Sequence, residues 1–263
     1  MEFPLAARLV PRLIAMDEVS STNDELTARA SDSTVPEFTV VATTTQTAGR
    51  GRLGRTWQAP PGTSLAVSIL VRPQDAHLDS DLYGWLPLIA GLAMSRAVRA
   101  LLPHREVSLK WPNDVLIDQK KVSGLLCELL PNGSVVVGAG VNLTIPEKAL
   151  PVPQATSLML MGVVGPAEEL ADLVLARYVR ELMVLREGLA AGGDGESVRT
   201  IRNSVSEACS TLGQRIRLVL PGSEDVYGTA LDLDDAGRLR FRRDEDGSVQ
   251  AVAAGDVTHL RYE

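Results

Sequence analysis

Apolar residues along this chain follow two periods, and each period predicts a different kind of element. Alternating and β-branched runs predict strands, which fall at residues 9–15, 38–43, 64–72, 107–117, 121–128 and 134–138. Apolar residues at helical spacing predict helices at residues 22–30, 82–102, 167–189 and 198–209. Pro103 should end the second of these helices. Up to residue 209, the pattern therefore predicts strands and helices together.

From residue 214 onward the pattern predicts only short strands. They cover residues 215–220, 226–233, 238–241, 249–252 and 257–260, with Gly-containing turns between several of them. Such a series is typical of a small β-barrel. A glycine-rich stretch at residues 188–195 predicts a loose connection before it. We therefore expect a large domain at residues 1–209 and a small β-barrel domain at residues 210–263.

Composition and charge limit the class of protein. The chain has 263 residues, 45% of them hydrophobic, which is enough for a substantial core. Its net charge of −7 argues against nucleic acid as the main partner, because phosphate binding needs a basic face. Cys127 and Cys209 are the only cysteines, which fits a reducing cytoplasm. Charges interrupt the N-terminal apolar segment and no apolar run is long enough to span a membrane, so we expect neither signal peptide nor membrane partner.

Residues 49–57, Gly-Arg-Gly-Arg-Leu-Gly-Arg-Thr-Trp, carry the most distinctive chemistry. Arg50, Arg52 and Arg55 offer planar donors that match phosphate and carboxylate oxygens, and the glycines let the backbone approach a ligand. Trp57 adds an indole on which a flat group can stack. The glycine spacing also fits a dinucleotide fingerprint, but prolines rather than a helix follow it, so that interpretation fails. The run predicts an anion-binding loop held between two strands.

Two further stretches admit both a functional and a purely structural interpretation. Thr22-x-x-Glu25 has the pattern of a capping box at the start of the helix at residues 22–30. Backbone amides there could bind a carboxylate or a polar ring, although an ordinary helix cap explains the same letters. Residues 138–143, Gly-Ala-Gly-Val-Asn-Leu, are interpreted as a glycine-bracketed turn that presents Asn142 to ribose or phosphate, or as a simple tight turn.

Lys110 stands where the predicted strand at residues 107–117 is broken by Trp111-Pro112. An ammonium fixed at such a break can neutralise two anionic groups as they react, whereas an isolated lysine at a strand end is more often a surface residue. Cys127 is interpreted as a small buried hydrophobe and not as a nucleophile, because no histidine lies near it in sequence. The three histidines are scattered, and the sequence predicts no metal site.

Taken together, these motifs resemble the biotin protein ligases. The resemblance rests on the Ser-Thr-Asn helix start, the Gly/Arg/Trp loop, Lys-Trp-Pro-Asn-Asp, Lys-x-x-Gly-Leu-Leu-x-Glu from Lys121 to Glu128, and Gly-x-Gly-x-Asn. It runs in order over residues 13–143, and residues 256–261 resemble the end of that family's small C-terminal domain. The fold implied is α+β: a mixed-sheet catalytic domain packed with helices, plus a small SH3-like β-barrel.

The resemblance also implies an activity and roles for individual residues. The activity is ATP-dependent formation of biotinyl-5′-adenylate with release of pyrophosphate, followed by transfer of biotin to a lysine of the biotin carboxyl carrier domain of a carboxylase. The catalytic residues implied are Lys110, Arg50 and Arg52. Those implied for biotin are Ser21, Thr22, Asn23, Gln46, Gly49, Arg50, Gly51, Arg52, Lys110 and Gly124. Those implied for the nucleotide are Arg50, Arg52, Arg55, Trp57, Lys110, Asn113, Asn142 and Arg261.

Several properties follow as expectations from this resemblance. Biotin and ATP with Mg²⁺ are substrates, and no tightly bound cofactor is expected. Only about twenty residues precede the catalytic region, so we expect a monofunctional ligase without DNA binding, working in the cytoplasm as a monomer or weak homodimer. The alternatives are a lipoate or octanoate ligase or transferase of the same fold and a non-catalytic sensor of biotin or an adenylate. The Gly/Arg loop and Lys-Trp-Pro-Asn-Asp argue against the first, and intact Lys110, Arg50 and Arg52 argue against the second.

Overall fold

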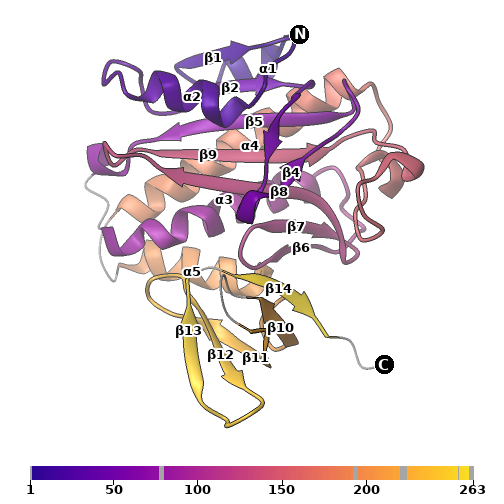
Figure 1. Cartoon of the computed structure of the whole chain (residues 1–263). Helices are drawn as coiled ribbons and strands as arrows, with labels where there is room; N and C mark the ends of the chain where they lie inside the picture. The colour runs from indigo at the N-terminus through magenta and orange to yellow at the C-terminus, as the bar shows by residue number, and fades with distance from the viewer. Residues whose placement is uncertain (1, 77–79, 192–194, 220–223, 254, 261–263) are drawn as a thin grey trace.

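A seven-stranded mixed sheet forms the centre of the molecule (Figure 1). The computed structural model describes residues 2–76, 80–191, 195–219, 224–253 and 255–260. The strand order is β1-β2-β5-β9-β8-β7-β6; β1 and β2 are parallel and every other pair is antiparallel. The strands are β1 Arg12–Ala15, β2 Thr39–Thr43, β5 Ser64–Val71, β6 Val107–Lys110, β7 Asp114–Ile117, β8 Lys120–Leu129 and β9 Val135–Asn142. The mixed sheet and the α+β class are therefore confirmed.

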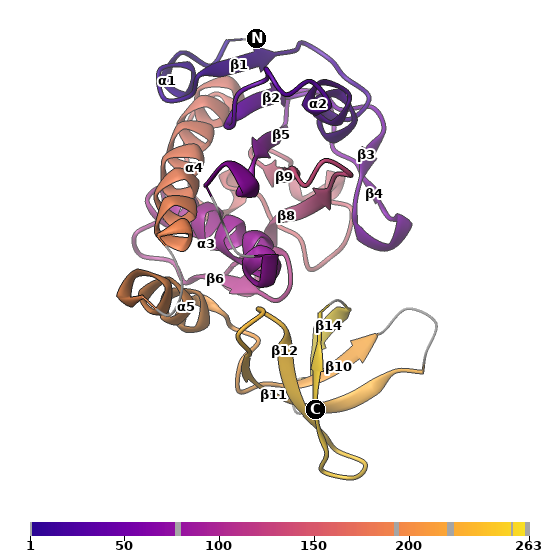
Figure 2. The same ribbon diagram turned by 90° about the vertical axis from the view of Figure 1, so that its left-hand side faces the viewer.

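Helices cover the two faces of this sheet unequally (Figure 2). α3 (Leu86–Arg99) and α4 (Ala167–Ala190) pack together on one face, with α5 (Glu196–Ala208) beside them, while α2 (Thr22–Ala30) lies on the other face against β2, β5 and β9. The remaining helices are short: α1 Pro4–Ala7 and the 3-10 turns η1 Arg52–Gly54, η2 Pro73–Ala76, η3 Ser80–Trp85, η4 Glu147–Ala149 and η5 Met159–Met161. One face of the sheet is thus closed by helices, and only part of the other is covered.

Alternation along the strands builds a separate core on each face. Val40 and Ile69 belong to the large cluster under α3 and α4, whereas Val41, Leu70 and Val136 pack with Leu26 of α2. Both faces are therefore apolar near the middle of the sheet, which is why every residue of β2, β5 and β9 is buried. Beside the start of α2, this face changes to the small residues Ala66, Gly124, Gly138 and Gly140.

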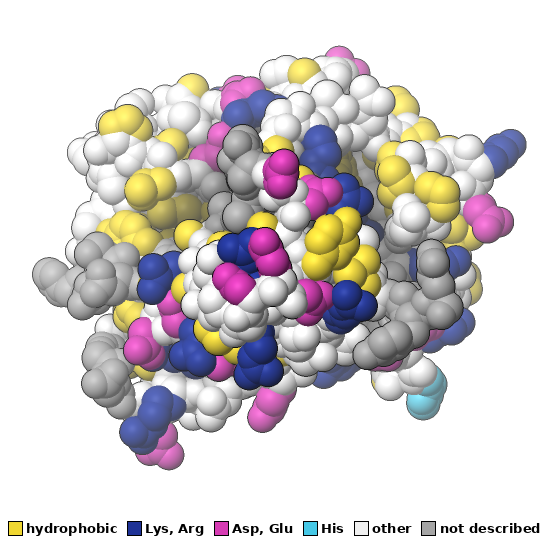
Figure 3. Space-filling view, turned by 60° about the horizontal axis from the view of Figure 1, so that its bottom comes forward, with side chains coloured by type: hydrophobic (Ala, Val, Ile, Leu, Met, Phe, Trp, Pro, Cys, Tyr) yellow, Lys and Arg dark blue, Asp and Glu magenta, His cyan; other side chains and the backbone are white. Residues whose placement is uncertain are grey.

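The C-terminal strands form a five-stranded antiparallel sheet of their own. Its order is β13-β12-β11-β10-β14, with β10 Arg215–Val219, β11 Val226–Leu233, β12 Leu239–Arg243, β13 Val249–Val252 and β14 Asp256–His259. All five strands predicted after residue 214 are present. Arginines and carboxylates pair across this sheet, as in Arg215–Asp244 and Arg240–Asp232. The face in Figure 3 accordingly shows both charges side by side rather than one continuous basic patch.

Three predicted elements need correction. Residues 138–143 are not a turn, because all but Leu143 belong to β9; the glycines serve instead to let side chains lie against the strand. The helix expected at residues 82–102 is shorter, since α3 begins at Leu86 after the 3-10 turn η3 and ends at Arg99. The predicted loose connection starts late as well, because α4 continues through Gly188 to Ala190. Within the described residues, no helix is both long enough and apolar enough to cross a membrane.

Candidate active site

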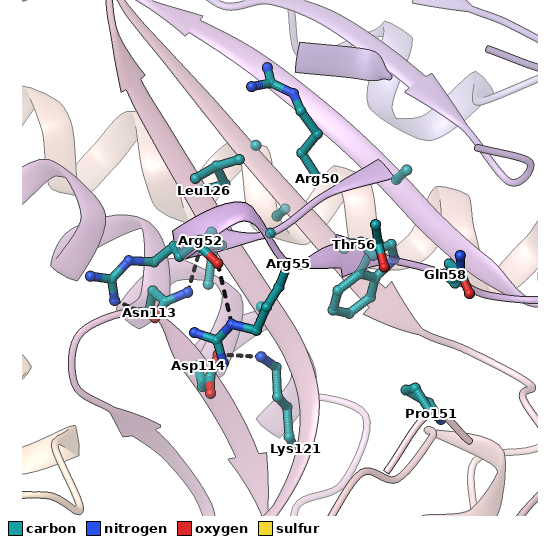
Figure 4. Close-up of a pocket in the computed structure, with 18 of the residues that line it drawn as sticks. Arg50, Arg52, Arg55, Thr56, Gln58, Asn113, Asp114, Lys121, Leu126 and Pro151 are labelled. Carbon is teal, nitrogen blue, oxygen red and sulfur yellow. Dashed lines mark hydrogen bonds and ion pairs between the residues drawn. The ribbon is translucent and has the colours of Figure 1, made fainter. Parts of the chain in front are cut away.

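A cavity of about 430 Å³ lies on the open part of the sheet (Figure 4). Its walls come from the start of α2, the small hairpin of β3 (Gly49–Arg50) and β4 (Thr56–Trp57), and the break between β6 and β7. Its floor is small residues on neighbouring strands, Ala66 of β5, Gly124 of β8, and Gly138 and Gly140 of β9. Val257 and Thr258 of β14 close one side. The cavity therefore joins segments from both parts of the chain.

Polar side chains at the start of α2 form a hydrogen-bonded group at one end of the cavity. Thr22 donates its backbone N–H to Gln46 Oε1 at 2.9 Å. The Ser68 hydroxyl donates to Asn23 Oδ1 at 2.6 Å and lies 2.8 Å from Thr22 Oγ1. Thr22 and Asn23 are almost fully buried. Their orientations are thus fixed by one another, as a site that recognises a polar ring requires.

The helix cap differs from the predicted capping box by one residue. Ser21 is the N-cap: its backbone is extended, and its hydroxyl accepts the N–H of Asp24 at 3.3 Å. Thr22 is already helical and Glu25 pairs with Arg29 instead of reaching back. Because the amides of Thr22 and Asp24 donate within the protein, this helix start is an ordinary cap that positions side chains.

Arg50 connects the Gly/Arg loop to α2 and β8. Its guanidinium contacts Asp24 Oδ1 at 2.5 Å and Glu128 Oε2 at 2.9 Å. Glu128 Oε2 also accepts from Asn23 Nδ2 at 2.6 Å. Arg50 of the loop and Asn23 of α2 therefore share one carboxylate oxygen.

The rest of the loop is held by the break between β6 and β7. Gly51 donates its N–H to the carbonyl of Arg55 at 2.6 Å, which closes the loop on itself. Arg52 donates to Asn113 Oδ1 at 3.0 Å (Figure 4), and it also donates to the carbonyl of Gly255 at 3.4 Å. Asn113 also donates to the carbonyl of Leu125 at 2.8 Å. Asn113 thus orients Arg52, a contact that the sequence did not predict.

Trp57 lies across the floor of the cavity. A Cβ atom built on Gly140 would stand 2.4 Å from the indole of Trp57, and one on Gly124 would stand 3.3 Å from it. Gly124 and Gly140 are paired between β8 and β9, so the indole requires glycine at position 140 and leaves little room for a side chain at position 124. Lys121 Nζ lies 6.0 Å from the centre of the indole and pairs with Asp114 Oδ1 at 2.5 Å. These contacts place a second lysine in the cavity beside Lys110.

Contacts from the segment that follows α5 hold the residues on either side of Lys110. Leu109 O accepts from the N–H of Ser210 at 2.8 Å, and Trp111 donates its N–H to Thr211 Oγ1 at 3.0 Å. The peptide bond between Trp111 and Pro112 is cis. Both neighbours of Lys110 are therefore fixed from the segment that leads into the C-terminal sheet.

The remaining predicted residues are distributed as follows. Asn142 is buried in the cavity wall and donates to the carbonyl of Thr156 at 2.8 Å. Gly49 has no room for a side chain, because a Cβ would lie 2.3 Å from Gln46 Nε2. Arg261 lies outside the described residues. Sequence reasoning missed Ser68, Asp114, Lys121 and Glu128 as parts of the site, although the last three occur in motifs that it singled out.

Neither cysteine is poised for catalysis. Cys127 is only partly buried, but loss of hydration and the nearby carboxylate of Glu128 raise the pKa of its thiol to about 12. Burial also raises the pKa of Cys209. The interpretation of Cys127 as chemically inert is consistent with these shifts. Among the described side chains, no group of three or more His, Cys, Asp or Glu could hold a metal ion.

A mixed sheet with a Gly/Arg hairpin over a glycine floor is typical of ligases of the biotin and lipoate class. Comparison of this chain with known proteins agrees. Residues 15–143 match the biotin/lipoate A/B protein ligase family, and residues 211–260 match the biotin protein ligase C-terminal domain. A biotin–[acetyl-CoA-carboxylase] ligase of Mycobacterium tuberculosis is 38% identical over 95% of this chain and 90% of its own length. One from Paracoccus denitrificans is 34% identical over 81% of this chain and 86% of its own length.

Solved structures point the same way. A biotin protein ligase from Aquifex aeolicus in complex with biotin and ATP aligns with a TM-score of 0.72 and 30% identity, over 96% of this chain and all of that one. One from Leishmania major in complex with biotin aligns with a TM-score of 0.62 and 28% identity, over 93% of this chain and 99% of that one. This chain belongs to the biotin protein ligase family.

Proposed function

We propose that this chain activates biotin with ATP to biotinyl-5′-adenylate, releasing pyrophosphate, and transfers the biotinyl group to a lysine of a biotin carboxyl carrier domain. One observation carries the proposal: the cavity has oriented neutral donors and acceptors at one end and a group of cations at the other. A substrate with a polar uncharged ring and a carboxylate fits such a division. The Aquifex relative was solved with biotin and ATP, which supports the same pair of substrates.

In this proposal the ring end binds biotin through side chains that are already fixed. Ser21, Thr22, Asn23 and Gln46 gather there, with Ser68 beneath them. Asn23 and Gln46 place amide groups where a ureido ring can exchange hydrogen bonds with them. Because these groups are oriented before the ligand arrives, binding needs little reorganisation.

The cationic end serves the chemistry. Attack of a carboxylate on the α-phosphate brings two anions together, so fixed cations lower their repulsion and stabilise charge at phosphorus. Arg52, held by Asn113, and Lys110, fixed through its neighbours, supply such charges. ATP would bring Mg²⁺ bound through its own phosphates and water. Trp57 offers the flat surface for adenine, with Arg55 and Asn142 as further nucleotide contacts.

Lys121 is a second candidate for the cation that bridges the two reacting groups. Its ammonium lies in the cavity between Asp114 and the indole of Trp57, whereas sequence reasoning assigned this role to Lys110 alone. A lysine paired with one carboxylate keeps a fixed position yet can turn toward a stronger anion. The two lysines can be separated by experiment.

Lys110→Ala should abolish adenylate formation without unfolding the protein, because the charge is lost from the wall of the cavity and not from the core. Pyrophosphate release and thermal unfolding of this variant would be measured beside Lys121→Ala. Loss of activity only in Lys121→Ala would transfer the bridging role to that residue. Normal turnover in Lys110→Ala would remove Lys110 from the mechanism.

Transfer to a carrier is tested by mass spectrometry. The protein is incubated with biotin, Mg-ATP and an isolated biotin carboxyl carrier domain, and the expected result is one added biotinyl group. A carrier whose acceptor lysine is replaced by arginine is the control and should stay unmodified. Modification with lipoate or octanoate but not biotin would favour the sister activity, and no modification by any acid would favour a sensor.

We further propose a cytoplasmic ligase that is monomeric or weakly dimeric and does not bind nucleic acid. The net charge of −7 supports the absence of nucleic-acid binding, because a surface that binds phosphates needs an accumulation of basic residues.

A further inference from the structure

Glu128 ends the motif Lys-x-x-Gly-Leu-Leu-x-Glu but has no part in the roles assigned so far. It lies near the end of β8, and its side chain is 27% exposed. The same oxygen, Oε2, accepts from Asn23 Nδ2 at 2.6 Å and from the Arg50 guanidinium at 2.9 Å. One of these donors belongs to the ring end of the cavity and the other to the Gly/Arg loop.

The Asn23 amide cannot turn away from Glu128 without losing a second partner. Its Oδ1 accepts from Ser68 at 2.6 Å, so its Nδ2 must point in the opposite direction, toward the carboxylate. A Cβ on Gly138 would lie 2.1 Å from Oδ1, which shows how closely the amide is packed against β9. Asn23 Nδ2 also donates to the carbonyl of Leu126 at 3.3 Å, so Glu128 fixes the edge of the amide that faces a ligand together with Leu126 and Ser68.

Arg50 has a second carboxylate partner, Asp24, so the role of Glu128 can be distinguished from that of a simple ion pair with Arg50. Asp24 also contacts the guanidinium, at 2.5 Å, but its side chain is 57% exposed. Within the described residues, the Asp24 carboxylate accepts from Arg50 but not from the side chain of Asn23, whereas the Glu128 carboxylate accepts from both. An exposed ion pair contributes little, while a partly buried carboxylate shared by two donors constrains both of them.

We propose that Glu128 is a positioning residue that couples the ring end of the cavity to the Gly/Arg loop. The inference rests on the proposed function, in which Asn23 contacts the biotin ring, and on the catalytic role that the family resemblance implies for Arg50. A ligand that engages Asn23 acts on Glu128 Oε2 and hence on Arg50. The Gly/Arg loop thereby responds to a biotin ring bound at Asn23 and not only to the anionic groups that the loop binds.

Glu128→Gln tests this coupling because it keeps the size of the side chain. A glutamine that places its oxygen where Glu128 Oε2 stands can still accept from both donors but carries no charge, and one that places its NH₂ group there opposes both donors. We expect the KM for biotin to rise about tenfold, with the KM for ATP and the unfolding temperature nearly unchanged. Asp24→Asn is the matched control: it removes the exposed partner of Arg50 only, and the KM for biotin should change less than about twofold.

A double-mutant cycle separates coupling from simple weakening. With Glu128 present, the free-energy effects of Asn23→Ala and Arg50→Ala, calculated from the KM for biotin, should be non-additive. In the Glu128→Gln background these free-energy effects should be additive, so that the two fold-changes in KM multiply. Additive effects in both backgrounds, or equal effects of Glu128→Gln and Asp24→Asn, would overturn the coupling. Biotin-dependent pyrophosphate release by the unmodified protein is measured alongside. Its absence would overturn the proposed function itself, and its presence with additive effects would overturn only the role of Glu128.

Discussion

The two ends of the cavity are held in place in different ways. At the ring end, side chains hold one another: Thr22 and Asn23 hydrogen-bond to Gln46, Ser68 and Glu128, which lie 24 to 105 positions further along the chain. At the cationic end, the backbone around Lys110 is fixed by Ser210 and Thr211, which are about a hundred positions away. Both ends therefore depend on contacts between distant segments, through side chains at the ring end and through the backbone at the cationic end.

The cavity floor shows the same division within one strand. Gly138 leaves room for the amide of Asn23, and Gly140, two positions along β9, leaves room for the indole of Trp57. Neither glycine has a positive φ, so close approach of another side chain, and not backbone conformation, requires them. Each glycine serves one end of the cavity, and each end can be disturbed separately.

Alanine at these two glycines should give the largest effects. Gly138→Ala places a Cβ 2.1 Å from Asn23 Oδ1, so biotin binding should weaken at least tenfold with little change in the KM for ATP. Gly140→Ala places a Cβ 2.4 Å from the Trp57 indole, so the KM for ATP should rise with little change in biotin binding. Steady-state pyrophosphate release with each substrate varied measures both. Equal losses for both substrates in both variants would show that the two ends are not separable.

Arg52→Gly should weaken retention of the adenylate severalfold. The change removes the guanidinium that Asn113 and the carbonyl of Gly255 hold over the cavity. Released adenylate acylates amines without selection, so a bystander protein such as serum albumin should become biotinylated. Labelling of the bystander is followed by streptavidin blot against the unmodified protein. Unchanged labelling and unchanged adenylate release would count against a closing role for Arg52.

Thr211→Val should disturb the cationic end from a distance. It leaves the buried N–H of Trp111 without its acceptor, which costs about 1–3 kcal/mol of unfolding free energy. The KM for ATP should rise more than the KM for biotin, because the backbone beside Lys110 loses its anchor. Thr211→Ser keeps the hydroxyl and should restore both stability and the KM for ATP. A serine variant that behaves like valine would show that packing of the methyl group matters instead.

Changes at Cys127 should have the smallest effect. The pKa of its thiol is raised to about 12, so the thiol stays protonated, and therefore unreactive, at any lower pH used in an assay. Cys127→Ala should keep nearly full activity, and thiol-directed reagents at neutral pH should not inhibit the unmodified protein. A cysteine-dependent step in the pH-rate profile between pH 7 and about 10 would contradict this account.

Sequence patterns predicted much of the fold because most strands here have clear alternation or β-branched runs. They failed at β9, where glycines normally signal a turn but here make room for Asn23 and Trp57 from other segments. They predicted the motifs of the site but assigned only one lysine, because the positions of Lys121 and Glu128 in space depend on the pairing of β8 with β7 and β9. Contacts such as Trp111 with Thr211 leave no local signal at all.

The most direct test is pyrophosphate release from Mg-ATP with biotin, lipoate or octanoate supplied separately. The arrangement of a neutral hydrogen-bonding end opposite a cationic end predicts release with biotin, and little with acids that lack a polar ring. Release with lipoate or octanoate alone would contradict the assignment of the ring end. Release with none of the three acids would contradict adenylate formation and make a biotin or adenylate sensor the function to pursue.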